Sequence, residues 1–575
     1  VQGGVEKLAA DIVYDPKASP VLVRVQGPVD VAAIRDWQQL PQLAFAEGRT
    51  DVSALVTVLP GEPPLLTGTT ELVGVALDLP EPFAKVAEES LPLTFSMPLD
   101  ASNMVLSFDV DSALQLALDV SGGGLKGASL AFGAERMPVK TGTLLVGGHA
   151  GLVDELQWQA FADTYFRATT SGADPGDAPP SPAIAFEVDA LQADRLRIWG
   201  QEFTDVLLSL RQRGAEGDWW LAAQNSWFEG ELTLDNDMKV GDLKVAQVDL
   251  AGLDSLAFSD KEGAGEPLEL PDLAVSVAAL RNDGLLLGEL DFQLATDGDM
   301  LTAQDITADI AGLVLSAERP GSFSWQQGDP ASSQFKGLFT FTDLGEVFAN
   351  LNYQRVLQSR RGSLKLDLQW PGGPQNFALA SSQGELLLKA RDGRFLDAPE
   401  GASGTLRVVS LLNFAGVVRR LSLTHMFESG IPFDSVDAEA HLHSGTLEVN
   451  AIDVKGASSG FRFTGLVDLD NAPEPQTVDG ELVVTLPVAN NLPWVAALAA
   501  GLPVAAGVFV VSKVFEKQVN RFSSGVYSIT GNLDDPEVAF DRVFDDANGV
   551  GLIVTPQDPN AQPTADKVTE PSAQQ

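Results

Sequence analysis

Apolar and polar residues alternate with a period of two along most of this chain. Between residues 104 and 121, the apolar side chains occupy one parity, while Asp, Gln and Ser occupy the other. Because successive side chains of a strand point to opposite faces, this pattern predicts strands with one apolar face and one wet face. The alternation recurs at residues 73–79, 290–294, 364–370, 436–442, 461–469 and 526–533.

Turn signals lie between these segments, at residues 121–124, 282–284, 297–299, 392–393 and 444–445. Such short connections favour antiparallel neighbours, so we expect a mainly β chain with an elongated, curled antiparallel sheet. The apolar face either packs against a second sheet, as in a sandwich, or lines an open groove, and periodicity alone does not decide between these. Candidate groove-lining residues are Leu106, Phe108, Leu114, Leu116, Leu118, Leu290, Phe292, Leu364, Leu366, Leu368, Phe461 and Phe463.

Helical patterns are few. We expect short helices at residues 30–40, where Asp30 is the cap, and at 82–90. Residues 344–358 have helical spacing of apolar side chains, and residues 406–421 are apolar around most of a helix. A last helical segment is expected at residues 492–522.

The stretch from residue 482 to 512 carries no charge. Asn490 and Asn491 can cap a helix there, whereas Gly501 and Pro503 interrupt it. We therefore expect a kinked helix or helical hairpin that dips into a membrane, with a groove plug and a full membrane span as alternatives. The residues expected to contact the membrane are Leu492, Trp494, Val495, Leu498, Leu502, Val508, Phe509, Lys513, Phe515, Lys517 and Arg521.

Composition narrows the function classes. The formal net charge of −42 would repel phosphate backbones, so we expect no nucleic acid partner. The chain has no cysteine, which excludes disulfides, thiolate nucleophiles and cysteine metal sites. It begins Val-Gln-Gly-Gly without a signal peptide, so we interpret it as a fragment whose N-terminal membrane anchor is missing.

Motifs with catalytic or binding chemistry are unconvincing here. Residues 122–127 match G-x-G-x-x-G and residues 456–460 match G-x-S-x-G, but alternating, strand-like sequence follows each motif where a helix is required. His441 and His443 share one face of a strand without an identifiable third ligand. We therefore predict no catalytic residues, no metal site, no cofactor and no enzyme activity.

Several phrases in the last third of the chain are typical of one family. They are GRFL at 393–396, LLNF at 411–414, FESGIPFD at 427–434, FEKQV at 515–519, YSITG at 527–531 and DDP at 534–536. Together they resemble the C-terminal region of the YhdP branch of the AsmA-like superfamily, which also includes TamB. The close resemblance spans about residues 343–541. Residues 1–342 are similar only in their alternating, strand-like pattern and in short phrases.

The resemblance implies a repeating β-groove region at residues 1–342, an AsmA-like C-terminal region at 343–545 and a disordered tail at 546–575. It also implies a periplasmic protein of a Gram-negative envelope, anchored in the inner membrane, with its C-terminus towards the outer membrane. The implied function is phospholipid transport between the two membranes, which supports the outer-membrane barrier. The alternative is a structural or assembly factor for outer-membrane proteins with envelope protein partners. We expect a monomer.

Overall fold

The computed structural model describes residues 9–13, 21–38, 44–100, 102, 104–111, 113–120, 125–167, 185–198, 201–212, 217–253, 270–396, 430–457, 460–469, 476–485, 524–533, 536–545 and 550–553. The chain divides into two compact units, Val1–Asp305 (unit 1) and Ile306–Gln575 (unit 2), and the division falls within strand β18. Both units are mainly β, as the alternation predicted. The domain boundary expected between residues 342 and 343 is where the close sequence resemblance begins, and it stays a prediction.

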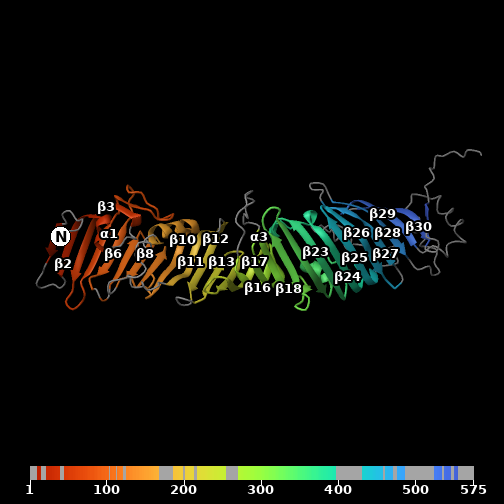
Figure 1. Ribbon diagram of the computed structural model, residues 1–575, viewed down its shortest axis with the longest axis horizontal. Helices are drawn as coiled ribbons and strands as arrows, with labels where there is room; N and C mark the ends of the chain where they lie inside the picture. The colour runs from red at the N-terminus through yellow and green to blue at the C-terminus, as the bar shows by residue number, and fades with distance from the viewer. Residues whose placement is uncertain are drawn as a thin grey trace, which may run out of the picture. The chain divides into compact units, whose positions relative to one another are not determined.

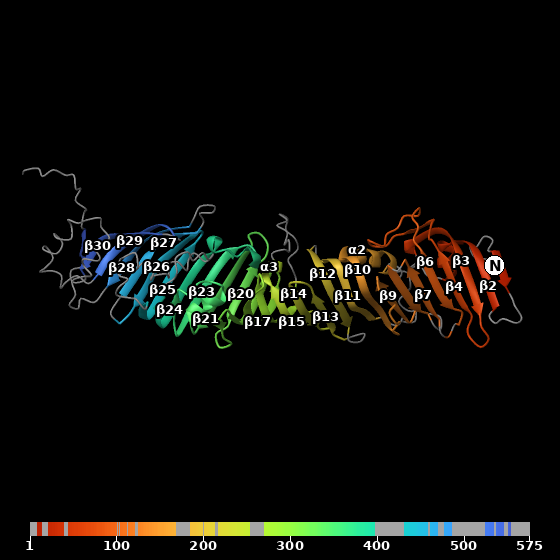
Figure 2. The same ribbon diagram turned by 180° about the vertical axis from the view of Figure 1, so that it is seen from behind.

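Unit 1 is a sheet whose strands follow one another in space almost in chain order (Figures 1 and 2). The strands are β1 (Ala9–Val13), β2 (Val21–Asp30), β3 (Ala46–Val58), β4 (Leu65–Thr70), β5 (Val75–Leu77), β6 (Leu93–Pro98), β7 (Val105–Val110), β8 (Leu114–Asp119), β9 (Gly127–Phe132), β10 (Thr143–Asp154), β11 (Ala185–Ile198), β12 (Gln201–Gln212), β13 (Trp219–Gln224), β14 (Phe228–Leu234), β15 (Val240–Asp249), β16 (Asp272–Asn282), β17 (Leu285–Asp297) and β18 (Met300–Ile310).

Most neighbouring strands of unit 1 are antiparallel, but β9–β10, β10–β11 and β15–β16 are parallel. The sheet is therefore mixed but mainly antiparallel, as the short connections predicted. A parallel pair needs a connection that returns to the starting edge, which is longer than a hairpin turn. Residues 133–142 make one such connection, and the hydroxyl of Ser129 in β9 donates to the carbonyl oxygen of Met137 within it at 2.8 Å.

Unit 2 continues with antiparallel pairs from β20 to β31. Its strands are β19 (Leu313–Leu315), β20 (Gly321–Gln326), β21 (Ser332–Phe341), β22 (Leu357–Gln358), β23 (Arg361–Pro371), β24 (Gln383–Phe395), β25 (Ile431–His443), β26 (Thr446–Lys455), β27 (Gly460–Asp468), β28 (Thr477–Thr485), β29 (Ser524–Asn532), β30 (Glu537–Asp545) and β31 (Val550–Ile553). Strand β31 lies within the tail expected to be disordered.

The helices of the described residues are short. They are α1 (Val31–Gln38), α2 (Glu155–Ala162) continuing into the π-helix η2 (Asp163–Arg167), α3 (Leu250–Leu253), α4 (Leu344–Asn350), and the 3-10 turns η4 (Pro374–Asn376) and η5 (Leu379–Ser381). None of the helices in this part of the chain is long and apolar enough to cross a membrane.

An aspartate precedes each of the four α-helices of the described residues, at the end of a strand or just after it. Asp30, Asp154, Asp249 and Asp343 each accept a hydrogen bond from a backbone N–H of the first helical turn. This is the N-cap arrangement, in which the carboxylate satisfies an N–H group that has no partner inside the helix. The cap predicted at Asp30 is confirmed, and the same device recurs at the three other helices.

Three local expectations were wrong. Residues 82–90 form no helix, because Lys85 bridges antiparallel to Leu77 instead. Asp392 and Gly393 are not a turn between strands but lie inside β24, where Asp392 has a φ of 55°. The helix expected over residues 344–358 ends at Asn350, and β22 follows it. The helices expected at 406–421 and 492–522 lie outside the described residues.

Candidate functional site

One face of the unit 1 sheet carries an unbroken row of uncharged, mostly apolar residues. The strand registers place each residue of the row opposite the next, so their side chains leave the sheet on the same side. This set, the apolar row of unit 1, is Val25, Ala54, Gly68, Phe95, Phe108, Leu116, Leu130, Val146, Val188, Leu210, Leu221, Leu232, Leu243, Val275 and Phe292. With strands about 4.8 Å apart, the row is about 65–70 Å long.

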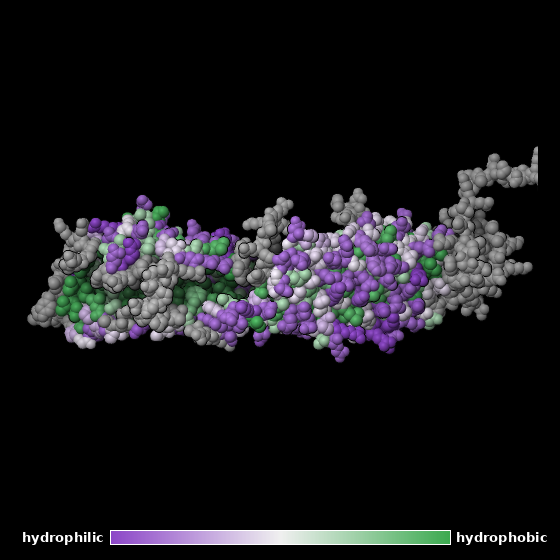
Figure 3. Space-filling model, in the orientation of Figure 1, coloured by the Kyte–Doolittle hydropathy of each residue, from purple (hydrophilic) through white to green (hydrophobic). Residues whose placement is uncertain are grey.

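The apolar row of unit 1 is only partly covered by protein. Phe108, Leu116 and Leu232 are half-buried, whereas Val146 and Val275 are buried. Figure 3 shows a hollow with hydrophobic residues along it on the face of unit 1 that is turned to the viewer. A folded soluble sheet normally buries such a face, so the exposed area marks this face as a candidate binding surface.

The groove residues predicted in unit 1 fall on this face together. Phe108 lies opposite Leu116, and the flanking positions Leu106 and Leu118 form the neighbouring cross-strand pair. Leu114 pairs with Val110 on the same face. Farther along the sheet, Leu290 and Phe292 lie opposite Val277 and Val275. Whether these side chains contact a ligand stays a prediction.

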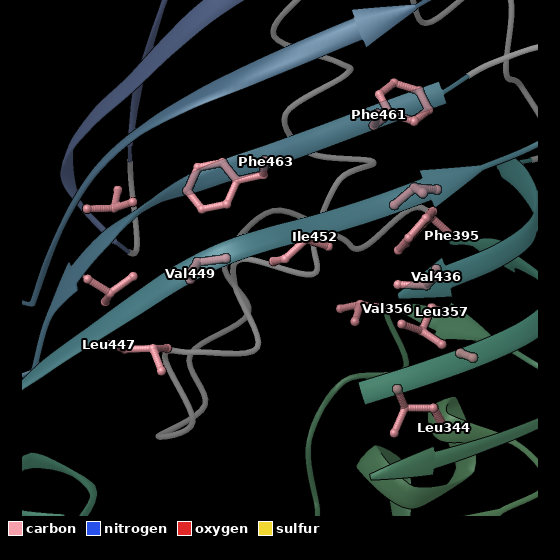
Figure 4. Packing of buried hydrophobic residues seen from close by; sticks show 14 of the residues in the cluster. Leu344, Val356, Leu357, Phe395, Val436, Leu447, Val449, Ile452, Phe461 and Phe463 are labelled. Atoms are coloured by element: carbon pink, nitrogen blue, oxygen red, sulfur yellow. The ribbon is translucent and has the colours of Figure 1, made fainter. Parts of the chain in front are cut away.

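Unit 2 has a row of the same kind. It runs Phe339, Leu364, Leu388, Ala438, Ile452, Phe463, Leu482, Tyr527 and Phe540. Leu366, Leu368 and Phe461 occupy neighbouring positions on this face. Figure 4 shows Phe461, Phe463 and Ile452 within one cluster of buried side chains. Here burial is nearly complete at several positions, since Phe463 is 2% exposed and Leu482 is fully buried.

Tyr527 is the polar exception in the row of unit 2. Its hydroxyl is buried and has no hydrogen-bond partner. Burial raises the pKa of this phenol above its usual value, because the charged form would lose its hydration. The hydroxyl is therefore neutral at physiological pH and is a polar atom directed into an apolar environment.

The opposite face of each sheet is polar. In unit 2 it carries ion pairs between neighbouring strands, such as Lys365 Nζ to Glu385 Oε2 at 2.7 Å. In unit 1 an open depression of about 390 Å³ between β2 and β7 is lined by Arg24, Asp109, five serines and threonines, and Ala54, Leu55, Gly68 and Phe95. This division between faces is what the alternation predicted.

Aromatic side chains gather at one edge of the apolar face of unit 1. Phe132, at the end of β9, lies 5.2 Å from Phe83 and 6.4 Å from Trp158 of α2, measured between ring centroids. Phe83 belongs to the loop between β4 and β6, so this loop meets helix α2 across the ends of the intervening strands. The sequence patterns missed this cluster because helix α2 has no clear apolar stripe.

The buried side chain of Lys85 stabilises the conformation of that loop. Its side chain is 7% exposed, and its ammonium group donates to the carbonyl oxygens of Leu72, Val75 and Val86 at 2.7–3.0 Å. Burial lowers the pKa of Lys85, while Glu89 and Glu88 partly oppose this effect. Three carbonyl dipoles thus replace the hydration of the ammonium group.

Residues considered for chemistry lie apart from the apolar faces. The G-x-S-x-G motif is followed by strand β27, so it lacks the helix that a nucleophile elbow requires. His441 and His443 stack at 6.1 Å on the polar face, where Asn450 contacts His441 and Glu448 lies near His443. The described residues contain no group of three or more side chains that could hold a metal ion.

The residues predicted to contact a membrane, from Leu492 to Arg521, all lie outside the described residues. Their contact with a membrane stays a prediction.

Comparison with known proteins completes this picture. No solved structure matches the chain. It is 24% identical over 257 residues to the Escherichia coli (strain K12) protein described as "Intermembrane phospholipid transporter YhdP". That alignment covers 44% of this chain and 20% of the relative, so the chain matches about a fifth of that protein's length. The family model described as YhdP protein matches residues 6–538. The chain therefore belongs to the YhdP family.

Proposed function

We propose that this chain is a section of a conduit that carries phospholipid between the two membranes of a bacterial envelope, with acyl chains on its apolar face. The observation that carries the proposal is the unbroken apolar row of unit 1, most of whose residues are only half-buried. The family membership supports it, because the E. coli relative bears the name of an intermembrane phospholipid transporter.

Simple energetics favour an acyl chain as the occupant. Covering apolar surface contributes about 25 cal/mol per Å², or about 0.8 kcal/mol for each methylene group that leaves water. The row offers a similar apolar surface at every step, so a bound chain meets no deep energy minimum as it moves along the sheet. Affinity and mobility are therefore compatible on one surface.

The same reasoning supports a location in the periplasm. An apolar row of this length serves a lipid only where the lipid must cross an aqueous layer, and the periplasm is such a layer. The sheet then replaces the membrane for the acyl chains, while the polar opposite face remains in water.

The proposal is tested by lipid capture. Purified chain is mixed with liposomes that contain a fluorescent phospholipid and is then separated from them by gel filtration. We expect the fluorescence to elute with the protein and to pass to unlabelled acceptor liposomes added afterwards.

A protein that elutes without lipid after this treatment would contradict the conduit. If lipid-free protein instead forms stable complexes with outer-membrane assembly proteins in crosslinking, the assembly-factor alternative replaces it. A matched negative control is any soluble β protein of similar net charge, which must capture no lipid.

A further inference from the structure

The hydroxyl of Tyr527 lies buried on the apolar face of unit 2 without a partner. Its side chain belongs to β29 and is 2% exposed, and the hydroxyl oxygen forms no hydrogen bond. The strand registers place Leu482 of β28 on one side of it and Phe540 of β30 on the other. The great majority of buried polar groups in proteins have a hydrogen-bond partner, so this exception requires an explanation.

The described surroundings of this hydroxyl offer it nothing to bind. On the same face, the next positions along β28, β29 and β30 are Val484, Ile529 and Val538, which are all apolar and belong to one packed cluster. The backbone of β29 pairs with β28 on one side and with β30 on the other. The described part of the chain therefore directs a hydrogen-bond donor at an apolar surface and leaves it unsatisfied.

The hydroxyl is available as a donor. Burial raises the pKa of the Tyr527 phenol, so its proton stays on the oxygen at physiological pH. The ring is held by an edge-to-face contact with Phe540, with centroids 5.5 Å apart and an interplanar angle of 74°. A fixed and dehydrated donor suits a ligand that brings an acceptor, but no donor, onto an apolar surface.

We propose that the hydroxyl of Tyr527 donates a hydrogen bond to an ester carbonyl of a phospholipid whose acyl chains lie on the apolar face of unit 2. This inference rests on the proposed function. An ester carbonyl accepts hydrogen bonds and has no N–H or O–H group. It joins the acyl chain to the glycerol, so it is the polar group that accompanies the chain onto an apolar surface. The donor and the acceptor then satisfy each other where neither has another partner.

The burial of the neighbouring side chains shows the side from which a lipid can approach. Leu482 in β28 is fully buried, whereas Val538 and Phe540 in β30 are half-buried. The apolar face is therefore less covered towards β30. An acyl chain that arrives from this side displaces the ring of Phe540, which contacts Tyr527, and brings the carbonyl to the hydroxyl.

Such a bond explains why the position carries a tyrosine. A phenylalanine would fill the same space without a buried, unsatisfied oxygen, so the hydroxyl lowers the stability of the lipid-free protein. The bond to the ester offsets this loss only when lipid is bound. Tyr527 thus favours ester-linked lipids over lipids that have the same chains but no carbonyl group.

The test compares two soluble phospholipids on the purified full chain by titration calorimetry. Dihexanoylphosphatidylcholine has ester carbonyls, and its di-O-hexyl ether analogue has the same headgroup and chain length without them. We expect Tyr527→Phe to weaken binding of the ester lipid by about threefold to tenfold, because one hydrogen bond is lost. The affinity for the ether lipid should not change.

Infrared spectroscopy gives a second measurement that does not depend on affinity. The stretching band of an ester carbonyl is separate from the amide bands of the protein, and a hydrogen bond moves it to lower wavenumber. We expect this shift in ester lipid bound to the wild-type chain and its loss in Tyr527→Phe. The same band position in both proteins would contradict the hydrogen bond.

The matched control is Tyr353→Phe, which makes the same chemical change at a half-buried tyrosine after α4 and outside the row. It should change neither affinity. Equal weakening of both lipids by Tyr527→Phe would assign the effect to packing of the ring and would overturn the proposal.

Two further outcomes separate this inference from the proposed function. If the wild-type chain binds both lipids and Tyr527→Phe changes neither affinity, the hydrogen bond is wrong, although the chain still binds lipid. If the wild-type chain binds neither lipid, the proposed function and this inference fail together.

Discussion

The ring of Phe463 covers two glycines in unit 2. A Cβ atom built on Gly480 would lie 2.6 Å from this ring, and one built on Gly465 would lie 3.1 Å from it. The two glycines therefore make room for an aromatic side chain that is 2% exposed. Phe463 is part of a packed core, whereas Leu116 in the row of unit 1 is half-buried. Substituting a row residue should therefore lower the free energy of unfolding more at Phe463 in unit 2 than at Leu116 in unit 1.

For Phe463→Ala we expect the free energy of unfolding of unit 2 to fall by about 3–5 kcal/mol, because a large buried side chain leaves a cavity. Urea denaturation followed by tryptophan fluorescence measures this change. Leu466→Ala, in the same strand but 50% exposed, is the control and should change stability little. Similar losses in both variants would contradict the packing described.

Tyr527→Phe should not destabilise the chain. The substitution removes a buried hydroxyl without a partner, and an unsatisfied polar group of this kind costs about 1–3 kcal/mol. We expect the urea midpoint to stay the same or to rise. A fall in the midpoint would show that the hydroxyl does have a partner in solution.

At the scale of elements, the last three of the four aspartate caps recur with similar spacing. Asp249 follows Asp154 by 95 residues, and Asp343 follows Asp249 by 94 residues. Each aspartate closes a run of strands and begins a short helix. In the sequence, these aspartates are only single acidic residues before apolar ones. The alternating pattern of the strands does not mark them as related positions.

The cap at Asp249 predicts a dependence on pH. Backbone N–H groups of Gly284, Ala251 and Asp283 hold the pKa of this carboxyl below its usual value, with Gly284 contributing most. A lowered pKa in the folded state contributes stability above the unfolded-state pKa, and this is lost as the pH falls through the folded-state pKa. Asn also caps helices, so Asp249→Asn isolates the charge.

We therefore expect the wild-type chain to be more stable than Asp249→Asn at pH 7. The difference should shrink below about pH 4, where the unfolded-state carboxyl becomes protonated. Urea midpoints of both proteins across this range measure it. A difference that is constant with pH would show that the carboxylate charge is irrelevant.

The sequence predicted an element well where only neighbouring residues determine it, and poorly where contacts between distant residues do. Local alternation assigned Phe108, Leu116 and Phe463 to the apolar side correctly. The helix expected at residues 82–90 failed because Lys85 is fixed by carbonyl groups up to 13 residues away, a contact that no local pattern reports.

At the scale of the whole molecule, mutations on the two faces of the sheet should affect lipid capture differently. Leu116→Asp places a charge on the apolar row, where an acyl chain offers it no partner, and we expect lipid capture to weaken about tenfold or more. Gln115→Asp, the neighbouring residue on the polar face, is the matched control and should leave capture unchanged. Because Leu116 is half-buried, circular dichroism should show that both variants remain folded.

Equal capture by wild type and Leu116→Asp would mean that lipid does not follow the apolar row of unit 1. In that case the row of unit 2 becomes the surface to test, with folding measured first because its side chains are more deeply buried.

The parallel pairs β10–β11 and β15–β16 have a consequence for how such a chain can change in length. Strands β11 to β15 begin and end in the same direction, and the connection after β15 returns the chain to the edge where β11 began. A tandem duplication of this block would join to its neighbours without reversing any strand or turning the apolar side outward. Each copy would add about 24 Å, so tandem duplication would lengthen the sheet in fixed increments.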